Sequence, residues 1–305
     1  MEITENMVYN VKSGATALKA KHSLICTKGS FQMFYDTHIH SLHSHDSKQE
    51  PEGNCTAAIE KGLSGIAFTD HADMWYFKER NSWEHIRASV KNAERLNDKY
   101  KGRLRVLRGL EVADAYFDKS VTESLIAELQ PDVVIGSIHC LSYKGLSDAY
   151  SCMDFSESEF SRPRLMEIMS KYFELLTDMA ENEDYDILAH LSCPFRYING
   201  KYGRGLRSEE FEEQIKTVLR AVISRSKALE INTSGLGTPF GDTMPDDVII
   251  EWYYRLGGRL LTLGSDAHSA QRVGFGFDET AEKLREKGFT HLAYYENRQP
   301  RLLPL

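Results

Sequence analysis

Cysteine is scarce in this sequence and is not paired in its spacing. The 305 residues include five cysteines, and no two of them form a Cys-x-x-Cys pair. An odd, dispersed set in a long chain is typical of reduced thiols and argues against a disulfide framework. We therefore expect a cytoplasmic protein. The five are Cys26, Cys55, Cys140, Cys152 and Cys193.

Long apolar runs and an excess of basic charge are also missing. No run approaches the roughly 20 apolar residues of a membrane-spanning helix, and no basic leader with an apolar core precedes a cleavage site. The formal net charge of −8 argues against a nucleic-acid surface. We expect a protein that acts on a small molecule, without a membrane or nucleic-acid partner. The sequence carries no signal for an oligomeric state.

Apolar runs alternate with amphipathic stretches from Met33 onward, whereas residues 1–32 show no clean period. We expect 1–32 to be a loosely ordered or peripheral extension and 33–305 to be one domain. Seven strands alternating with helices predict an α/β fold with a parallel sheet, and a closed barrel fits best. Polar, irregular loops are expected over 141–161 and after His190. The predicted strands are 31–35, 65–69, 104–112, 133–138, 186–189, 229–232 and 260–264.

The segment Asp36-Thr37-His38-Ile39-His40 follows the first apolar run. Side chains at i and i+2 of a strand point to the same face, so His38 and His40 can reach one point. Neutral imidazole is a common ligand of Zn, Fe and Mn. Taken alone, this stretch is also compatible with an exposed histidine-rich loop.

Histidine or acidic residues stand at the ends of nearly all the predicted strands. Barrel enzymes place their chemistry at that rim. The donors exceed the four that one tetrahedral ion requires and suit two or three ions. A carboxylate can bridge two cations that share a hydroxide, and this chemistry hydrolyses phosphate esters. The residues are His38, His40, Asp70, His71, Glu111, His139, His190, Asp266 and His268.

An ordered series of motifs resembles the PHP superfamily (polymerase and histidinol phosphatase) over Met33 to Leu305. Two further segments, Glu230 to Leu236 and Val273 to Phe277, resemble the histidinol-phosphatase branch. The series consists of Asp36-Thr37-His38-Ile39-His40, Thr69-Asp70-His71, Gly109-Leu110-Glu111-Val112, Gly136-Ser137-Ile138-His139, Ala189-His190 and Gly264-Ser265-Asp266-Ala267-His268.

The resemblance implies a distorted (β/α)7 TIM-like barrel with two or three divalent ions (Zn, Fe or Mn) at the C-terminal ends of the strands. It assigns His38, His40, Glu111 and Asp266 to the first ion, and Glu111, His139 and His190 to the second. His71 and His268 would hold the third with one ligand from the loop after His40. Asp46 is favoured for that loop position, and His45 is the alternative.

The activity that the resemblance implies is histidinol-phosphate phosphatase, an enzyme of histidine biosynthesis. We expect a metal-bridging hydroxide to attack phosphorus, with Glu111, Asp266 and His268 as catalytic residues and His268 or a bound water protonating the leaving alkoxide. Arg196 is the first choice for a phosphate contact, since a guanidinium can bind phosphate through two hydrogen bonds. Further substrate-binding candidates are Arg204, Ser234 and His43.

Other activities stay open at this stage. A PHP phosphoesterase could act on another small phosphate or on phosphotyrosine, and a PHP-type nuclease or a non-catalytic metal-binding regulator are more distant alternatives. The chain departs from many relatives at Gly237, where they carry a basic residue. The loops over 141–161 and 194–207 also look different, and such loops choose the substrate.

Overall fold

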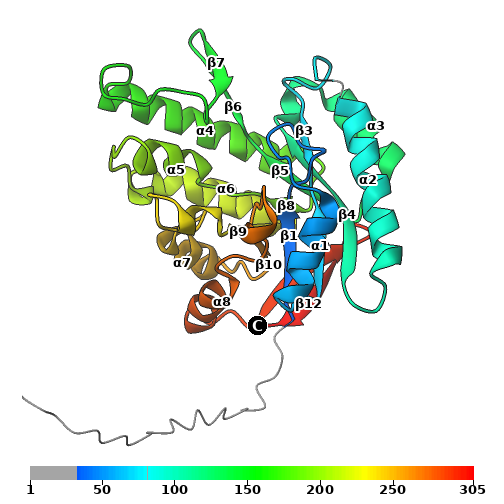
Figure 1. Cartoon of the computed structure of the whole chain (residues 1–305). Coiled ribbons are helices and arrows are strands. Elements are labelled where there is room, and N and C mark those ends of the chain that lie inside the picture. Colours follow the sequence, from blue (N-terminus) through cyan, green and yellow to red (C-terminus); the bar gives the residue numbers. More distant parts are fainter. Residues whose placement is uncertain (1–32, 81) are drawn as a thin grey trace, which may run out of the picture. The chain divides into compact units, whose positions relative to one another are not determined.

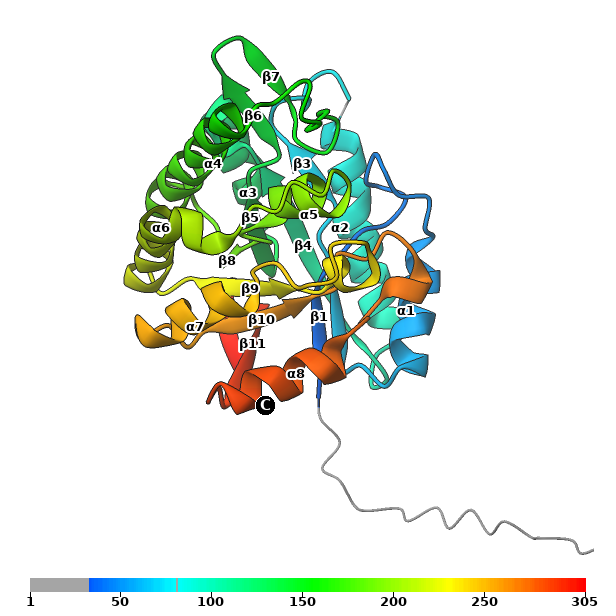
Figure 2. The same cartoon turned by 90° about the vertical axis from the view of Figure 1, so that its left-hand side faces the viewer.

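The computed structural model describes residues 33–80 and 82–305. The prediction for the extension 1–32 lies outside the described residues. The described part is built on a parallel sheet with helices around it (Figures 1 and 2). Neighbouring strands of the sheet follow in the order β1 (Tyr35–Ile39), β2 (Gly65–Phe68), β4 (Arg105–Ala113), β5 (Val133–Ser137), β8 (Ile187–Leu188), β9 (Ala228–Asn232) and β10 (Leu261–Gly264).

The path of seven strands closes almost completely into a barrel. Neighbouring strands pair parallel throughout. The first and last strands meet through a bridge between Ile39 and Ala267, and His40 N–H donates to the carbonyl of Ala267 at 2.9 Å. The expected TIM-like α/β barrel is therefore confirmed.

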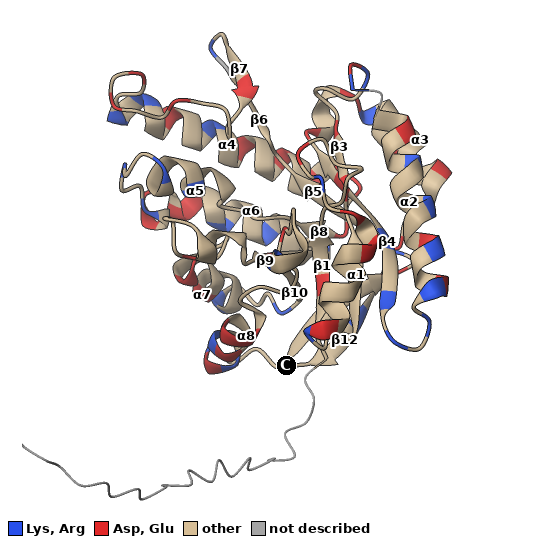
Figure 3. Cartoon of the chain, viewed as in Figure 1, with Lys and Arg blue, Asp and Glu red and all other residues tan. Residues whose placement is uncertain are grey.

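Helices follow the strands and pack outside the barrel. Asp118 and Asp246 cap two of them by accepting backbone N–H groups of Val121 and Ile249. Residues of both charge signs alternate along the outer faces, for example on α2 and α8 (Figure 3). The helices are α1 (Pro51–Glu60), α2 (Ser82–Lys99), α3 (Lys119–Leu129), α4 (Arg162–Asn182), α5 (Cys193–Gly200), α6 (Glu212–Ser224), α7 (Asp247–Arg255) and α8 (Phe277–Glu286).

Two hairpins lie at opposite ends of the barrel (Figures 1 and 2). One consists of β6 (Cys140–Tyr143) and β7 (Leu146–Ala149), and the other of β11 (His291–Glu296) and β12 (Gln299–Pro304). Each turn has two central residues with positive φ, Lys144-Gly145 and Asn297-Arg298, which is the geometry of a tight hairpin turn.

Several predicted boundaries were wrong. The first strand begins at Tyr35 and includes His38, instead of ending before the histidines. The expected loop over 141–161 contains the β6–β7 hairpin, because Lys144 and Gly145 turn the chain within two residues. The loop expected after His190 contains α5, whose first turn holds a proline. A short extra strand, β3 (His71–Asp73), pairs with β4.

The barrel interior is apolar at one end and polar at the other. Alternation along β4 places Leu107 and Glu111 on the same face, and Leu107 packs in a small cluster with Val133 and Ile135. The β11–β12 hairpin covers the apolar end, where the Tyr294 ring stacks on Tyr35 at 3.8 Å between centroids. Glu111 lies at the polar end, where the strands terminate.

Candidate metal centre

The polar end of the barrel brings the predicted donors together from different strands. His38 belongs to β1 and Glu111 to β4, while His71 begins β3. The remaining strand-end donors lie within a few residues after β1, β5, β8 and β10, and Asp46 lies further along the loop after β1. Most of the donors line a cavity of about 140 Å³, a size that suits a small ligand. Its lining includes Asp46, His71, Glu111, His139, His190, Asp266 and His268.

Glu111 is the centre of the cluster and is 1% exposed. Its Oε1 lies 3.0 Å from His190 Nε2 and 3.2 Å from His139 Nε2. Its Oε2 lies 2.8 Å from His71 Nδ1 and 3.4 Å from His38 Nε2, yet forms no hydrogen bond. A buried carboxylate oxygen without a hydrogen bond, surrounded by ring nitrogens, has the geometry of a ligand that bridges cations.

The tautomers of His38 and His40 follow from their partners. His38 Nδ1 lies 2.6 Å from Glu230 Oε1, a carboxylate that can only accept, so Nδ1 carries the proton. The Ser44 hydroxyl donates to Asp70 Oδ1 at 2.7 Å, so its oxygen accepts from His40 Nδ1 at 3.0 Å.

In the neutral rings both Nε2 atoms present lone pairs, although they lie only 3.0 Å apart. Two lone pairs at this distance repel each other unless a proton or a metal ion separates them. Against the effect of burial, nearby carboxylates raise the pKa of His38, so its ring can supply that proton when no metal is bound. The donors thus fit a metal ion at this position.

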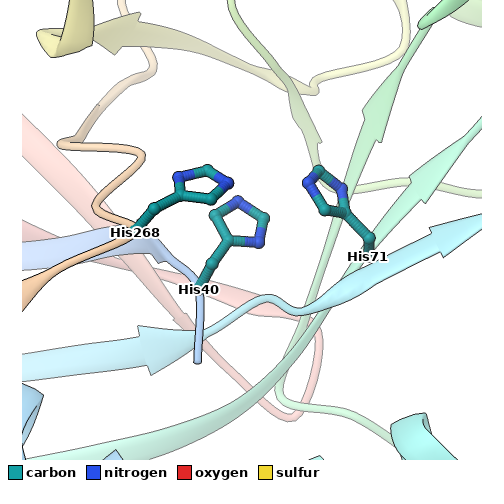
Figure 4. A group of neighbouring side chains, drawn as sticks. All are labelled: His40, His71 and His268. Atoms are coloured by element: carbon teal, nitrogen blue, oxygen red, sulfur yellow. The ribbon is translucent and has the colours of Figure 1, made fainter. Parts of the chain in front are cut away.

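A second group of donors lies around Asp46. Its Oδ2 is 3.0 Å from His268 Nε2 and 3.5 Å from His71 Nε2. The rings of His40, His71 and His268 face a common space in Figure 4, and the His40 and His268 centroids are 4.3 Å apart. His45 instead points its Nδ1 toward Asp73 Oδ2 at 3.6 Å. Of the two loop alternatives, Asp46 is therefore the one held between His71 and His268.

Overlapping sets of three donors lie within ligand distance of one another in the part of the chain that the structure describes. Because single residues recur in several sets, the cluster suits more than one cation. The sets are His38-His40-Asp266, His38-Glu111-His190, His40-His71-His268, His45-Asp46-His71 and His71-Asp73-His139.

Ionisation of the cluster is coupled to metal binding. Against the effect of burial, neighbouring carboxylates raise the pKa values of His38, His71 and His139 well above the usual value, so without metal these rings hold protons that a cation would displace. Burial, with His71 and His268 nearby, lowers the pKa of His40 to about 4, so its ring is neutral at pH 7. Burial alone would raise the pKa of Glu111, but the neighbouring His71, His139 and His38 hold it well below its usual value. Neutral imidazole and ionised carboxylate are the forms that ligate metals.

Two acidic residues support the donors, and the sequence did not mark them in this role. Glu230 accepts from His38 Nδ1 and from His190 N–H at 2.7 Å. Asp73 lies 3.1 Å from His139 Nδ1 and so orients its Nε2 toward Glu111. The spacing of Asp73 two residues after His71 was a signal for a shared face. Glu230 had no such signal, because it stands inside a strand.

Asp70 requires a correction. It was counted among the rim donors, but it does not face the cavity. Its Oδ1 accepts the Ser41 N–H and the Ser44 hydroxyl, both at 2.7 Å, and its Oδ2 accepts the Ser41 hydroxyl. Asp70 therefore holds the loop after β1, because both its oxygens accept donors of that loop and Oδ2 also accepts the Ser89 hydroxyl of α2.

The backbone is strained at two donors. His190 has φ 23° and Asp266 has φ 50°, in a region that non-glycine residues rarely adopt. Glu230 holds the first through the His190 N–H, and the His38 carbonyl holds the second by accepting Asp266 N–H at 2.7 Å. Such strain costs about 1–3 kcal/mol per residue and is typical of functional sites.

The candidate substrate-binding residues occupy different places. Arg196, on α5, lines the cavity and donates to Ser234 Oγ at 2.7 Å. The Ser234 hydroxyl in turn donates to Asn232 and lies 3.3 Å from Asp266 Oδ2. His43 lines a neighbouring hollow and lies 3.3 Å from Asn92 Nδ2.

Arg204 requires a correction as well. Its guanidinium donates to the backbone carbonyls of Phe155 and Phe160, and Arg204 is not among the residues that line the cavity. Its donors are used to hold the segment before α4, so the geometry opposes a phosphate contact.

Sequence comparisons give a consistent set of relatives. The family model described as PHP domain matches residues 36–234. The histidinol-phosphatase of Lactococcus lactis subsp. lactis is 30% identical over 262 residues, which cover 85% of this chain and 93% of that protein. A probable histidinol-phosphatase of Clostridium acetobutylicum is 32% identical over 269 residues, with coverages of 87% and 98%.

Structural comparisons point to the same group. The crystal structure of the Lactococcus lactis subsp. lactis histidinol phosphate phosphatase, complexed with zinc, L-histidinol and phosphate, matches with a TM-score of 0.67 and 26% identity. The match covers 89% of this chain and 99% of that chain. A putative histidinol phosphatase from Listeria monocytogenes shares the fold with a TM-score of 0.69 at 19% identity. Among the described helices, none is long and apolar enough to cross a membrane.

Proposed function

This chain belongs to the PHP domain family, and from that membership we propose that it hydrolyses L-histidinol phosphate to L-histidinol and phosphate. It is a phosphatase with a small-molecule substrate. The observation that carries the proposal is the cluster around Glu111, where one buried carboxylate meets ring nitrogens from four strands. The relative solved with zinc, L-histidinol and phosphate supports this substrate.

The chain would hold two or three divalent cations, with Zn, Fe and Mn as candidates. His38, His40, Glu111 and Asp266 would bind the first, and Glu111, His139 and His190 the second. Asp46, His71 and His268 would bind a third. When bound, such cations neutralise phosphoryl charge and acidify a water molecule to hydroxide near neutral pH.

The protein side chains supply positioning and proton transfer. Arg196 lines the cavity 3.8 Å from Asp266 Oδ2, where its guanidinium would contact phosphoryl oxygens. His268 Nδ1 donates to the Asp266 carbonyl at 2.9 Å, which fixes the ring with Nε2 toward the cavity. A bound water, or His268 when its Nε2 carries a proton and does not ligate a cation, would return a proton to the leaving alkoxide of histidinol.

All the assigned donors lie between His38 and His268. We therefore expect residues 33–305 to carry the complete hydrolase, with 1–32 as a peripheral extension. We also propose that the protein acts in the cytoplasm.

The test is phosphate release by the purified, metal-loaded protein from a panel that includes L-histidinol phosphate, other small phosphate monoesters and phosphotyrosine. We expect the highest kcat/KM for L-histidinol phosphate, together with two or three metal ions per chain by elemental analysis. A higher kcat/KM for another ester would reject the substrate assignment, and cleavage of single-stranded DNA would favour the nuclease alternative.

The variant Glu111→Gln tests the metal centre, because it removes the charge of the bridging carboxylate. We expect kcat to fall by at least about 10³-fold and the metal content to drop. The exposed residue Glu174 on α4 provides a matched control, Glu174→Gln, which should retain both values. Full activity of Glu111→Gln would contradict the assignment.

A further inference from the structure

A second arginine, Arg272, lies near Arg196 next to the candidate metal centre, although only Arg196 of the two lines its cavity. It ends a short 3₁₀ turn, Ala270–Arg272, that follows His268. Its Nη2 donates to the carbonyl oxygen of Ser234 at 3.0 Å, and Arg196 Nη1 donates to the hydroxyl of the same serine at 2.7 Å. Two guanidinium groups from different parts of the chain are therefore fixed on one residue.

The position of Arg272 depends on Gly237. A Cβ atom added at Gly237 would lie 2.9 Å from Arg272 Cζ and would overlap the guanidinium nitrogens. The guanidinium therefore fills the space that any other residue at 237 would occupy. It also stacks on the Phe275 ring, with Cζ 3.7 Å from the ring centroid. The group is thus packed on both sides rather than extended into solvent.

The two arginines have little compensating negative charge. Within residues 33–80 and 82–305, Arg272 forms no ion pair with a carboxylate, and Arg196 has only Asp266, at 3.8 Å. Asp266 also lies 3.3 Å from His40 Nε2 and belongs to the donor set of the first cation. Burial and the charge of Arg196 lower the pKa of Arg272, against the effect of Asp266. Two adjacent guanidinium groups with so little compensating negative charge favour a bound anion.

We propose that Arg272 and Arg196 form a two-arginine phosphate site around Ser234, which binds the phosphoryl oxygens that the metal centre leaves free. A phosphoryl group has three peripheral oxygens, and guanidinium groups bind such oxygens with charge-assisted hydrogen bonds. This site deepens the proposed function and rests on it for the identity of the substrate. The anion chemistry itself applies equally to inorganic phosphate, the other product of hydrolysis.

The first test is the variant Arg272→Gln in the metal-loaded protein, with inorganic phosphate as the probe. We expect calorimetry to give a Kd for phosphate about tenfold higher than that of the unmodified protein, from loss of a charge-assisted contact. The KM for L-histidinol phosphate should rise by a similar factor, while metal content stays unchanged. The matched control is Arg255→Gln, an exposed arginine on α7 that pairs with Glu251.

A second variant tests the same site without removing the arginine. Gly237→Ala should displace the guanidinium, because the added Cβ overlaps its nitrogens. We expect weaker phosphate binding in the same direction as for Arg272→Gln. The double variant should bind phosphate no more weakly than Arg272→Gln alone, since both changes act on one group.

The outcomes separate this site from the substrate assignment. If the unmodified protein releases no phosphate from L-histidinol phosphate but binds inorganic phosphate about tenfold more tightly than both variants, the arginine site stands and the substrate assignment fails. If the protein turns over this substrate and both variants bind phosphate as tightly as it does, the arginine site is rejected. A loss of metal from Arg272→Gln, with normal phosphate binding once metal is restored, would also reject it.

Discussion

Glu230 shows how much a single residue outside the ligand set determines at this site. It is fully buried, and its two oxygens fix the His38 ring and the His190 backbone. Gly264 permits this contact, because a Cβ there would lie 2.6 Å from His38 Cβ and closer still to the Glu230 carboxylate. The positions of two donors on different strands thus depend on one carboxylate.

Replacing Glu230 with Gln should weaken metal binding. Glutamine has only one acceptor oxygen, so either His38 Nδ1–H or the His190 N–H loses its acceptor and one of the two ligands is no longer held in place. We expect metal affinity to fall about 10- to 100-fold, with activity recovering when metal is added in excess. Titration in chelator-buffered zinc or manganese measures this. If the metal affinity of Glu230→Gln equals that of the exposed control Glu286→Gln, Glu230 does not position the metal ligand His38.

Asp46 and His45 are the two candidates for the metal ligand from the loop after His40, and their substitution should have different effects. Asp46 contacts both His71 and His268, whereas His45 faces Asp73. Asp46→Asn should therefore lower the metal content by roughly one ion per chain, because a neutral amide is a weaker ligand than a carboxylate. His45→Asn should leave the content unchanged. Elemental analysis of both variants distinguishes the alternatives, and the reverse pattern would assign His45.

At the scale of elements, the sequence predicted the strands better than the segments between them. Apolar runs such as Val133–Ser137 are buried strands in the structure. The β6–β7 hairpin was not predicted, because its strands are short and carry polar residues. Helix α5 was missed for a similar reason, since eight residues with a leading proline show little periodicity. Short elements take their form mainly from tertiary contacts, which no local pattern encodes.

The donors were predictable to the extent that local spacing encodes them. The two-residue period of β1 correctly indicated that His38 and His40 approach each other, with Nε2 atoms 3.0 Å apart. The same reasoning failed for Asp70, because its partners Ser41, Ser44 and Ser89 become neighbours only in the folded chain. The position of Arg272 was not predictable from local spacing either, since its guanidinium occupies the space that a side chain at Gly237 would fill.

Asp132 joins the C-terminal hairpin to the barrel. Its ionisation should therefore make the stability of the fold depend on pH. Its carboxylate accepts Arg108 N–H at 3.0 Å, Arg108 Nε at 3.1 Å and the Asn297 N–H at 3.2 Å. Burial opposes ionisation of this group, but Arg108 holds its pKa below the usual 3.8. Asp132→Asn should therefore lower the free energy of unfolding at pH 7 by about 2 kcal/mol.

The sign of the pH effect follows from the lowered pKa. The stabilisation is complete above the pKa of the unfolded state and disappears as pH falls through the lower pKa of the folded state. The difference between the unmodified protein and Asp132→Asn should consequently shrink below about pH 4. Urea unfolding at pH 7 and at lower pH measures this, with the exposed Asp98→Asn as control. A difference that grows on acidification would contradict the assignment.

For the whole molecule, metal removal should lower thermal stability. The free cluster holds ring nitrogens against one another and two donors in strained backbone, and bound cations would offset both costs. A ligand at about 1,000 times its Kd stabilises the folded state by about 4 kcal/mol. We expect chelation to lower Tm by about 10 °C, reversibly on addition of zinc or manganese. Calorimetric scans with equal Tm values would show that the cluster is stable without cations.

The almost closed barrel also has a consequence for synthesis of the chain. His38 and His40 lie on or just after the first strand, while Asp266 and His268 follow β10, and these two strands meet where the barrel closes, for example at the bridge between Ile39 and Ala267. A nascent chain on the ribosome carries the early histidines long before their partners emerge. Products that terminate before residue 266 would lack the second half of this ligand set. Binding of the full set of metal ions would therefore mark chains that have been translated through the final barrel strand.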